Sequence, residues 1–217
     1  MIVDYSAYLT AARQAARLAG AFLREQFHSV KLVDETLLHD IKLRLDKESQ
    51  ELITRHLLAA FPQSAVLGEE GNTGDSAAEF LWVVDPIDGT VNYFYGIPIF
   101  CVSIALQHKG EWVLGCVYDP MQQECFEAIA GQQPTLNGVP IAVSGRRQMR
   151  EAVVLWGMAR TMAPARGESA ALPIFPARCV RCGFWGARRS RCATLPPGAL
   201  MLMWKTASAC GILPPLV

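Results

Sequence analysis

The segment FLWVVDPIDGTVNYFYGIPIFCVSIAL, residues 80–106, places two aspartates between two apolar runs. Short apolar runs bounded by turn residues are typical of buried strands. The runs LWVVD and IFCVSIAL therefore predict two core strands, with Asp85 and Asp88 where the first one ends. Carboxylates at such a place belong either to a turn or to a functional site. Asp-Pro-x-Asp-Gly by itself is compatible with a plain turn.

The flanking sequence predicts helices before this segment and strands around and after it. Residues 4–28 repeat apolar side chains at helical spacing, and Asp46 is placed to cap a second helix over 47–60. Lys109-Gly110 and Asn137-Gly138 are hairpin turns. This order predicts an α/β fold, an α+β layered sandwich of alternating helices and sheets. The apolar positions expected to face the core from the two helices are Tyr8, Ala11, Ala12, Ala15, Leu18, Ala19, Phe22, Leu23, Leu52, Ile53, Leu57 and Ala60.

Charge and hydropathy exclude several classes of partner. The 217 residues carry no net charge, so no basic excess predicts nucleic acid or an anionic membrane as a partner. No apolar run reaches the roughly 18 residues of a membrane helix. The first residues lack the apolar core of a signal peptide, so we expect a cytoplasmic protein with reduced cysteines.

Carboxylates recur where predicted strands end. Glu69-Glu70 follows one short strand, and Asp85 and Asp88 follow the next. Magnesium takes hard oxygen ligands, including a few carboxylates. Pro86 restricts the backbone, so that the turn can aim both aspartates and a neighbouring carbonyl at one point. The pattern predicts a magnesium site that hydrolyses a phosphate ester.

These residues also resemble a known family. VLGEEG, followed by WVVDPIDGTVNYFYGIPIFCVSIAL and later by LNGVPIAVS, is similar to the inositol monophosphatase family of magnesium-dependent, lithium-sensitive phosphatases. The resemblance covers roughly residues 4–155 and implies a sugar-phosphatase-like sandwich and inositol 1-phosphate as the substrate. It also implies that Glu70 binds the first metal and orients the attacking water. Asp85 would bridge two metals, Ile87 would bind metal through its carbonyl, and Asp88 would bind the second metal.

The same resemblance assigns the remaining site residues. Ile87, Gly89 and Thr90 would bind the phosphate of the substrate, and Thr90 would also help to place the water. Asp46 matches a carboxylate that hydrogen-bonds the region of the catalytic threonine. Glu70, Thr90 and Asp46 are thus the implied catalytic residues. Family members are often homodimers, which makes a homodimer possible here.

The last quarter of the chain departs from the family. All 20 Asp and Glu residues lie within 1–168, whereas 169–217 holds four of the seven cysteines and six of the 13 prolines. The family's Gly-Ser-Ala-Ala segment and its Trp-Asp-x-Ala-Ala-Gly motif, whose Asp completes the second metal site, are absent. We therefore divide the chain into a family-like part, 1–165, and an aberrant tail, 166–217. The C-terminal layer of the sandwich is expected to be incomplete and activity to be weak.

The hypothesis that best explains the composition of this tail is an out-of-frame translation. If each codon is read one base earlier, Met203-Trp204-Lys205 must yield Val-Glu, and ordinary codons permit both missing motifs at family-like spacing. A zinc site on Cys179, Cys182, Cys192 and Cys210 is a weaker hypothesis, because structural zinc sites usually come as two close cysteine pairs. The sequence is also compatible with a nucleotide bisphosphate or sugar phosphate substrate, with a non-catalytic metal- or phosphate-binding remnant, and with a genuine basic interaction tail.

Overall fold

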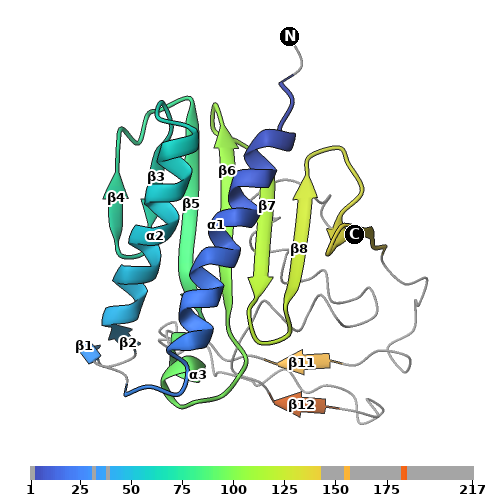
Figure 1. The fold of residues 1–217 in the computed structure, drawn as a ribbon. Helices are drawn as coiled ribbons and strands as arrows, with labels where there is room; N and C mark the ends of the chain where they lie inside the picture. The colour runs from blue at the N-terminus through green and yellow to red at the C-terminus, as the bar shows by residue number, and fades with distance from the viewer. Residues whose placement is uncertain (1–2, 31–32, 38–39, 143–153, 157–181, 185–217) are drawn as a thin grey trace, which may run out of the picture.

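A mixed sheet covered on one face by two long helices forms the body of the molecule (Figure 1). The structure is a computed structural model that describes residues 3–30, 33–37, 40–142, 154–156 and 182–184. The sheet has eight strands in the order β10-β9-β8-β7-β6-β5-β3-β4. They are β3 (Ala65–Gly68), β4 (Gly71–Thr73), β5 (Phe80–Asp88), β6 (Cys101–His108), β7 (Glu111–Asp119), β8 (Glu124–Ile129), β9 (Thr135–Leu136) and β10 (Val139–Pro140).

The direction of one strand pair matters most for the site. Strand β3 runs parallel to β5, whereas every other neighbouring pair in this sheet is antiparallel. The two predicted hairpin turns are confirmed. Lys109 and Gly110 have φ of 53° and 82°, and Asn137 and Gly138 have φ of 50° and 80°, as turns that match strand twist require.

Helices α1 (Ser6–Glu25) and α2 (Arg44–Ala60) pack against each other and against the sheet (Figure 1). Small residues form the buried face of α1, which lets the helix approach the strands closely: Ala11, Ala12, Ala15, Ala16, Ala19 and Gly20. Two predicted core positions are wrong. Leu18 is 53% exposed and Ala60 is exposed, because helical spacing identifies an apolar stripe but not how far the neighbouring layers cover it.

Two apolar clusters lie on the two faces of the sheet. Trp82 and Val84 of β5 belong to the larger cluster under the helices. Val83 packs in a second cluster on the opposite face, together with Cys101 and Ala105 of β6. Side chains alternate between the faces of a strand, so residues of β5 with odd numbers up to Asp85 point away from the helices.

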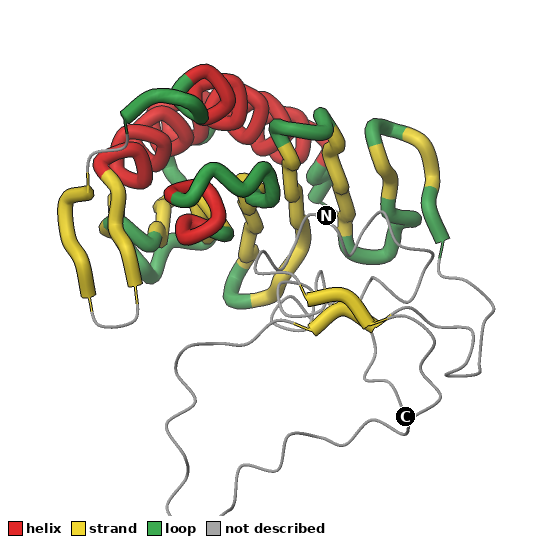
Figure 2. The backbone as a smooth tube through the Cα atoms, turned by 90° about the horizontal axis from the view of Figure 1, so that it is seen from below, coloured by secondary structure: helices red, strands yellow, loops and turns green. Residues whose placement is uncertain are grey.

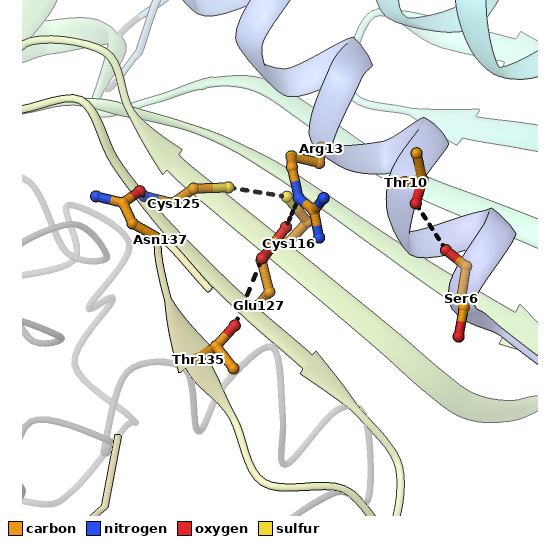
Figure 3. Close-up of polar contacts among 8 residues, drawn as sticks. All are labelled: Ser6, Thr10, Arg13, Cys116, Cys125, Glu127, Thr135 and Asn137. Carbon is orange, nitrogen blue, oxygen red and sulfur yellow. Dashed lines mark hydrogen bonds and ion pairs between the residues drawn. The ribbon is translucent and has the colours of Figure 1, made fainter. Parts of the chain in front are cut away.

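A charged pair joins α1 to the far strands of the sheet. The Arg13 guanidinium donates to the carboxylate of Glu127 on β8, and Thr135 donates to the same carboxylate at 3.5 Å (Figure 3). Cys116 and Cys125 lie beside this pair, with their sulfur atoms 3.7 Å apart. Glu127 is only 3% exposed, so its charge is buried beneath α1.

Two small strand pairs complete the described structure. Strands β1 (Val33–Leu37) and β2 (Asp40–Leu43) form an antiparallel pair before α2. Strands β11 (Val154–Trp156) and β12 (Cys182–Phe184) run parallel to each other on the side of the sheet away from the helices (Figure 2). The layered α/β fold is thus as predicted.

The rest of the proposed tail lies outside the described residues, as do the 165/166 boundary and the four cysteine sulfur atoms of the zinc hypothesis. Within the described part of the chain, no helix has the length and apolarity needed to cross a membrane.

Candidate metal and phosphate site

The Glu69-Glu70 turn and Asp85 lie at the neighbouring carboxyl ends of two strands. Strands β3 and β5 are parallel neighbours, with Gly68 opposite Val84. Their carboxyl ends therefore lie side by side, which is where open sheets with parallel strands carry ligands. The amide of Glu69 donates to the carbonyl of Val84 at 3.3 Å, so the Glu69-Glu70 turn is attached next to Asp85.

An irregularity in β5 brings Asp85 and Asp88 onto one face. Residues three apart on a regular strand point to opposite faces. Here Asp85 pairs with Ser103 and Asp88 with Cys101. Between these two pairs the chain advances by three residues along β5 but by only two along β6. This β-bulge inserts one extra residue and returns Asp88 to the face of Asp85. The Cys101 thiol contacts Asp88 Oδ2 at 3.6 Å, on the side away from the helices.

The sequence-based interpretation of this stretch needs a correction. The apolar run LWVVD predicts a strand that ends at Asp85 and a turn from there to Asp88, whereas β5 continues through Asp88 and contains the bulge. The antiparallel partner β6 supplies the hydrogen bonds that keep these residues in the sheet, and a single strand's sequence does not reveal that partner. The two aspartates and the buried Ile87 are therefore held by the sheet rather than by a free loop.

The residues after the bulge form a tight start to a helix. Gly89 has φ of 98°, which a residue with a Cβ adopts only with strain, and α3 (Thr90–Phe94) begins directly after it. A helix therefore starts at this position, although α3 has only five residues. The Thr90 hydroxyl donates to the carbonyl of Ile87 at 2.8 Å. That hydrogen bond fixes the orientation of the carbonyl that the family resemblance assigns to a metal.

Buried polar groups attach α3 to α1 and to the segment that precedes β6. The Tyr93 hydroxyl donates to the carbonyl of Leu23 at 2.8 Å, and the Asn92 amide donates to the carbonyl of Ile99 at 2.8 Å. Both side chains are buried. Burial, with a smaller effect from the negative charge of Asp46, raises the pKa of Tyr93, so its hydroxyl remains a proton donor at neutral pH.

Asp46 occupies a different helix position from the one predicted. Helix α2 begins at Arg44, so Asp46 is its third residue rather than its cap, and its Oδ2 accepts the amide of Leu43 at 2.7 Å. This is the reciprocal half of a capping box, made by a side chain that reaches back. Asp46 is 4% exposed and lies close enough to act on Tyr93 of α3. Its predicted bond to the Thr90 region stays a prediction.

Sequence reasoning missed Gln50, which holds the Glu69-Glu70 turn. Gln50 Oε1 accepts the amide of Glu70 at 2.8 Å, and Gln50 Nε2 donates to the carbonyl of Gly71 at 2.9 Å. The available signal was its spacing. Gln50 lies four residues after Asp46, on the same face of α2.

The donor set at this edge fits a hard cation. The carboxylates of Glu70, Asp85 and Asp88 and the carbonyl of Ile87 offer oxygen atoms only, which suits magnesium. The described residues that form a compact three-ligand group, with atoms within 4.8 Å of one another, are instead Cys116, Cys125 and Glu127.

That cysteine-containing group does not suit a cation, because Arg13 already neutralises Glu127. The hydrogen bond with Cys125, together with burial, raises the pKa of the Cys116 thiol, whereas metals bind thiolates. The family resemblance would place Glu70 and Asp88 on different metals, so their carboxylates would not need to lie within one such group.

Comparisons with known proteins agree on one family. The model of the inositol monophosphatase family matches residues 4–193. Inositol monophosphatase 3 of Solanum lycopersicum is 36% identical over 151 residues, which cover 68% of this chain and 56% of the relative. The fructose-1,6-bisphosphatase/inositol-1-monophosphatase of Aquifex aeolicus is 36% identical over 152 residues, covering 69% and 58%. The crystal structure of the extragenic suppressor protein suhB from Bartonella henselae matches with a TM-score of 0.74 at 27% identity, over 88% of this chain and 74% of that one.

The chain spans about half the length of the curated relatives it matches. The family match nevertheless takes in most of the 217 residues, including every strand of the eight-stranded sheet and both helices that cover it. The chain belongs to the inositol monophosphatase family.

Proposed function

We propose that the edge formed by β3, β5 and α3 is the site of a magnesium-dependent phosphate monoesterase, with inositol 1-phosphate as its substrate. One observation carries the proposal. The β-bulge places Asp85 and Asp88 on one face of β5, and the parallel strand β3 delivers the Glu69-Glu70 turn beside them. Family membership supports a phosphatase, and the name of the Aquifex aeolicus relative, fructose-1,6-bisphosphatase/inositol-1-monophosphatase, supports this choice of substrate.

Different residues of the site would bind the metal ions and the phosphate. Glu70, Asp85 and the Ile87 carbonyl would hold one magnesium ion, and Asp85 and Asp88 a second. When bound, such ions lower the pKa of water and neutralise charge on phosphoryl oxygens. Gly89 lets the backbone come close to the phosphate, because no Cβ stands in the way.

The Thr90 hydroxyl, unlike the Thr90 backbone N–H, has a narrower role than a general phosphate ligand. Its hydroxyl proton is given to the Ile87 carbonyl, so its oxygen offers only lone pairs. A lone pair accepts a hydrogen bond from water but repels a phosphate oxygen. We therefore assign Thr90 to orienting the attacking water, with Glu70 as the second group that holds it and Asp46 as support for this region.

The absence of a Trp-Asp motif from these 217 residues bears on the activity that we expect of them. No Trp-Asp pair occurs in these 217 residues, so Asp85 and Asp88 would hold the second metal without the third carboxylate that the family resemblance implies. A site with fewer carboxylates binds magnesium more weakly. Turnover is therefore expected to be far below that of a full-length family member.

The test combines metal binding with phosphate release. Calorimetry should detect magnesium binding by the intact chain, and Asp88→Asn should weaken it at least about tenfold. The release of phosphate from inositol 1-phosphate should be slow and magnesium-dependent, and the same substitution should abolish it. Ser64→Ala, at the other end of β3, is the control. An unchanged magnesium affinity in Asp88→Asn would contradict the site.

Two other results would redirect the assignment. Turnover equal to that of a full-length relative would overturn the expected impairment, and magnesium binding with no turnover would favour a non-catalytic remnant. Fructose 1,6-bisphosphate is the second substrate to assay, because the Aquifex aeolicus relative is named for both activities. A higher rate on that compound would favour a sugar phosphate as the natural substrate, and a nucleotide bisphosphate belongs in the same panel.

A further inference from the structure

The Glu69-Glu70 turn is held from two sides by elements distant in the sequence. On one side the Glu69 amide donates to the Val84 carbonyl of β5. On the other side the carboxamide of Gln50, from α2, accepts from the Glu70 amide at 2.8 Å and donates to the Gly71 carbonyl at 2.9 Å. Gln50 is 7% exposed, so water competes little for either bond.

The packing around the carboxamide is close enough to be specific. A Cβ at Gly68 would lie far inside van der Waals contact with the carboxamide of Gln50. Only glycine at this position leaves room for the Gln50 amide against the strand. Gly68 and Gln50 therefore form one unit, in which the missing side chain of the first accommodates the second.

The chemistry of the two bonds calls for an amide. The Glu70 N–H needs an acceptor and the Gly71 carbonyl needs a donor, and a neutral carboxamide supplies both at once. A carboxylate would satisfy the N–H but not the carbonyl, and an aliphatic side chain would satisfy neither. Gln50 thus specifies the backbone conformation of the turn on both sides of Glu70.

We propose that Gln50 is a positioning residue that fixes the Glu69-Glu70 turn, so that the Glu70 carboxylate is held beside Asp85 before metal binds. This proposal rests on the proposed function for the assignment of Glu70 as a metal ligand. Asp46 lies one helical turn earlier on α2, and its negative charge contributes to the raised pKa of Tyr93 on α3.

Two variants remove the same contact in different ways. Gln50→Met keeps the volume of the side chain and removes both hydrogen bonds. Gly68→Ala leaves Gln50 intact but forces its amide out of place. Each variant should bind magnesium about 10- to 100-fold more weakly than the parent, as loss of groups that orient metal ligands generally does.

Hydrogen exchange in the metal-free protein gives a readout that does not depend on activity. In both variants the Glu70 amide should exchange faster, because its buried acceptor is lost. Ser64→Ala is the matched control, since it removes the buried hydrogen bond between Ser64 and Trp82 at the opposite end of β3. It should lower thermal stability without changing the magnesium affinity or the exchange of the Glu70 amide.

The outcomes separate this proposal from the function it rests on. If the parent binds no magnesium, the proposed function fails, and protection of the Glu70 amide still decides whether Gln50 holds the turn. If the parent binds magnesium and Gln50→Met, folded by circular dichroism, binds it equally well, the positioning role is wrong. If Ser64→Ala weakens magnesium binding as much as Gln50→Met, general destabilisation explains the result and overturns the proposal.

Discussion

The environment of Glu124, at the start of β8, disfavours the ionised form of its carboxylate. Its Oε2 atom is buried and has no hydrogen-bond partner within the described part of the chain. Burial, and then the nearby charge of Asp119, raise the pKa of Glu124. The folded state therefore holds the Glu124 proton more tightly than the unfolded state does. This stabilising contribution is complete below the unfolded pKa and is lost as the pH rises through the folded value.

Glu124→Gln should consequently stabilise the protein at pH 7. The gain in the free energy of unfolding is expected to be no more than about 1 kcal/mol, because solvent screens a partly exposed carboxylate. It should vanish at a pH below the ordinary glutamate pKa, where the carboxyl is neutral in both states. Urea unfolding at several pH values measures this, with the exposed Glu111→Gln as control. A gain that persisted at low pH would exclude a charge effect.

At the scale of elements, the Arg13–Glu127 pair fastens α1 to β8 (Figure 3). The Arg13 side chain is 35% exposed, but that of Glu127 is 3% exposed. Removing one partner of a buried pair leaves the other charge unpaired and poorly solvated. The net contribution of the pair to the free energy of unfolding is therefore smaller than the stability that is lost when only one partner is removed.

Arg13→Leu should lower the free energy of unfolding by about 2–4 kcal/mol. The double variant Arg13→Leu/Glu127→Leu should recover most of that loss, because no buried charge remains. Chemical denaturation of both variants provides the measurement. Arg44→Leu is the control, since the Arg44–Glu48 pair is exposed and should contribute less than about 0.5 kcal/mol. If the double variant were as unstable as Arg13→Leu, loss of packing would be the cause.

At the scale of the whole molecule, the tail decides whether the proposed site can be completed. The family match runs to residue 193, past the boundary at 165 that composition suggested. Strand β12 also lies beyond that boundary and pairs with β11. Similarity to the family thus continues into the segment that holds no acidic residue after Glu168. The out-of-frame origin of the tail stays a prediction.

The coding DNA tests that prediction directly. The frame one base before codon 203 should read Val-Glu at Met203 to Lys205 and continue to Trp-Asp. It should also contain Gly-Ser-Ala-Ala upstream. A shifted frame that lacks Trp-Asp would refute the idea. In that case, bound zinc detected by mass spectrometry would favour a genuine cysteine-rich tail.

The sequence by itself determined the main elements and predicted the chemistry of the site. Periodicity predicted α1 and α2, and glycine turns predicted the hairpins. The acidic pattern and the family resemblance predicted Glu70, Asp85 and Asp88 as oxygen donors, which stays a prediction. These features depend on residues close together along the chain, such as a glycine that permits positive φ or an apolar stripe that repeats with the helix. Local signals of this kind can be recognised in the sequence without knowing which elements pack together.

Only the tertiary structure decided which of these residues meet. The bulge that turns Asp88 to the face of Asp85 exists because β6 pairs with both. The position of Glu70 depends on the parallel pairing of β3 with β5 and on the Gln50 amide from α2. Neither arrangement follows from local preference, because a strand's register and a turn's supports are supplied by segments elsewhere in the chain.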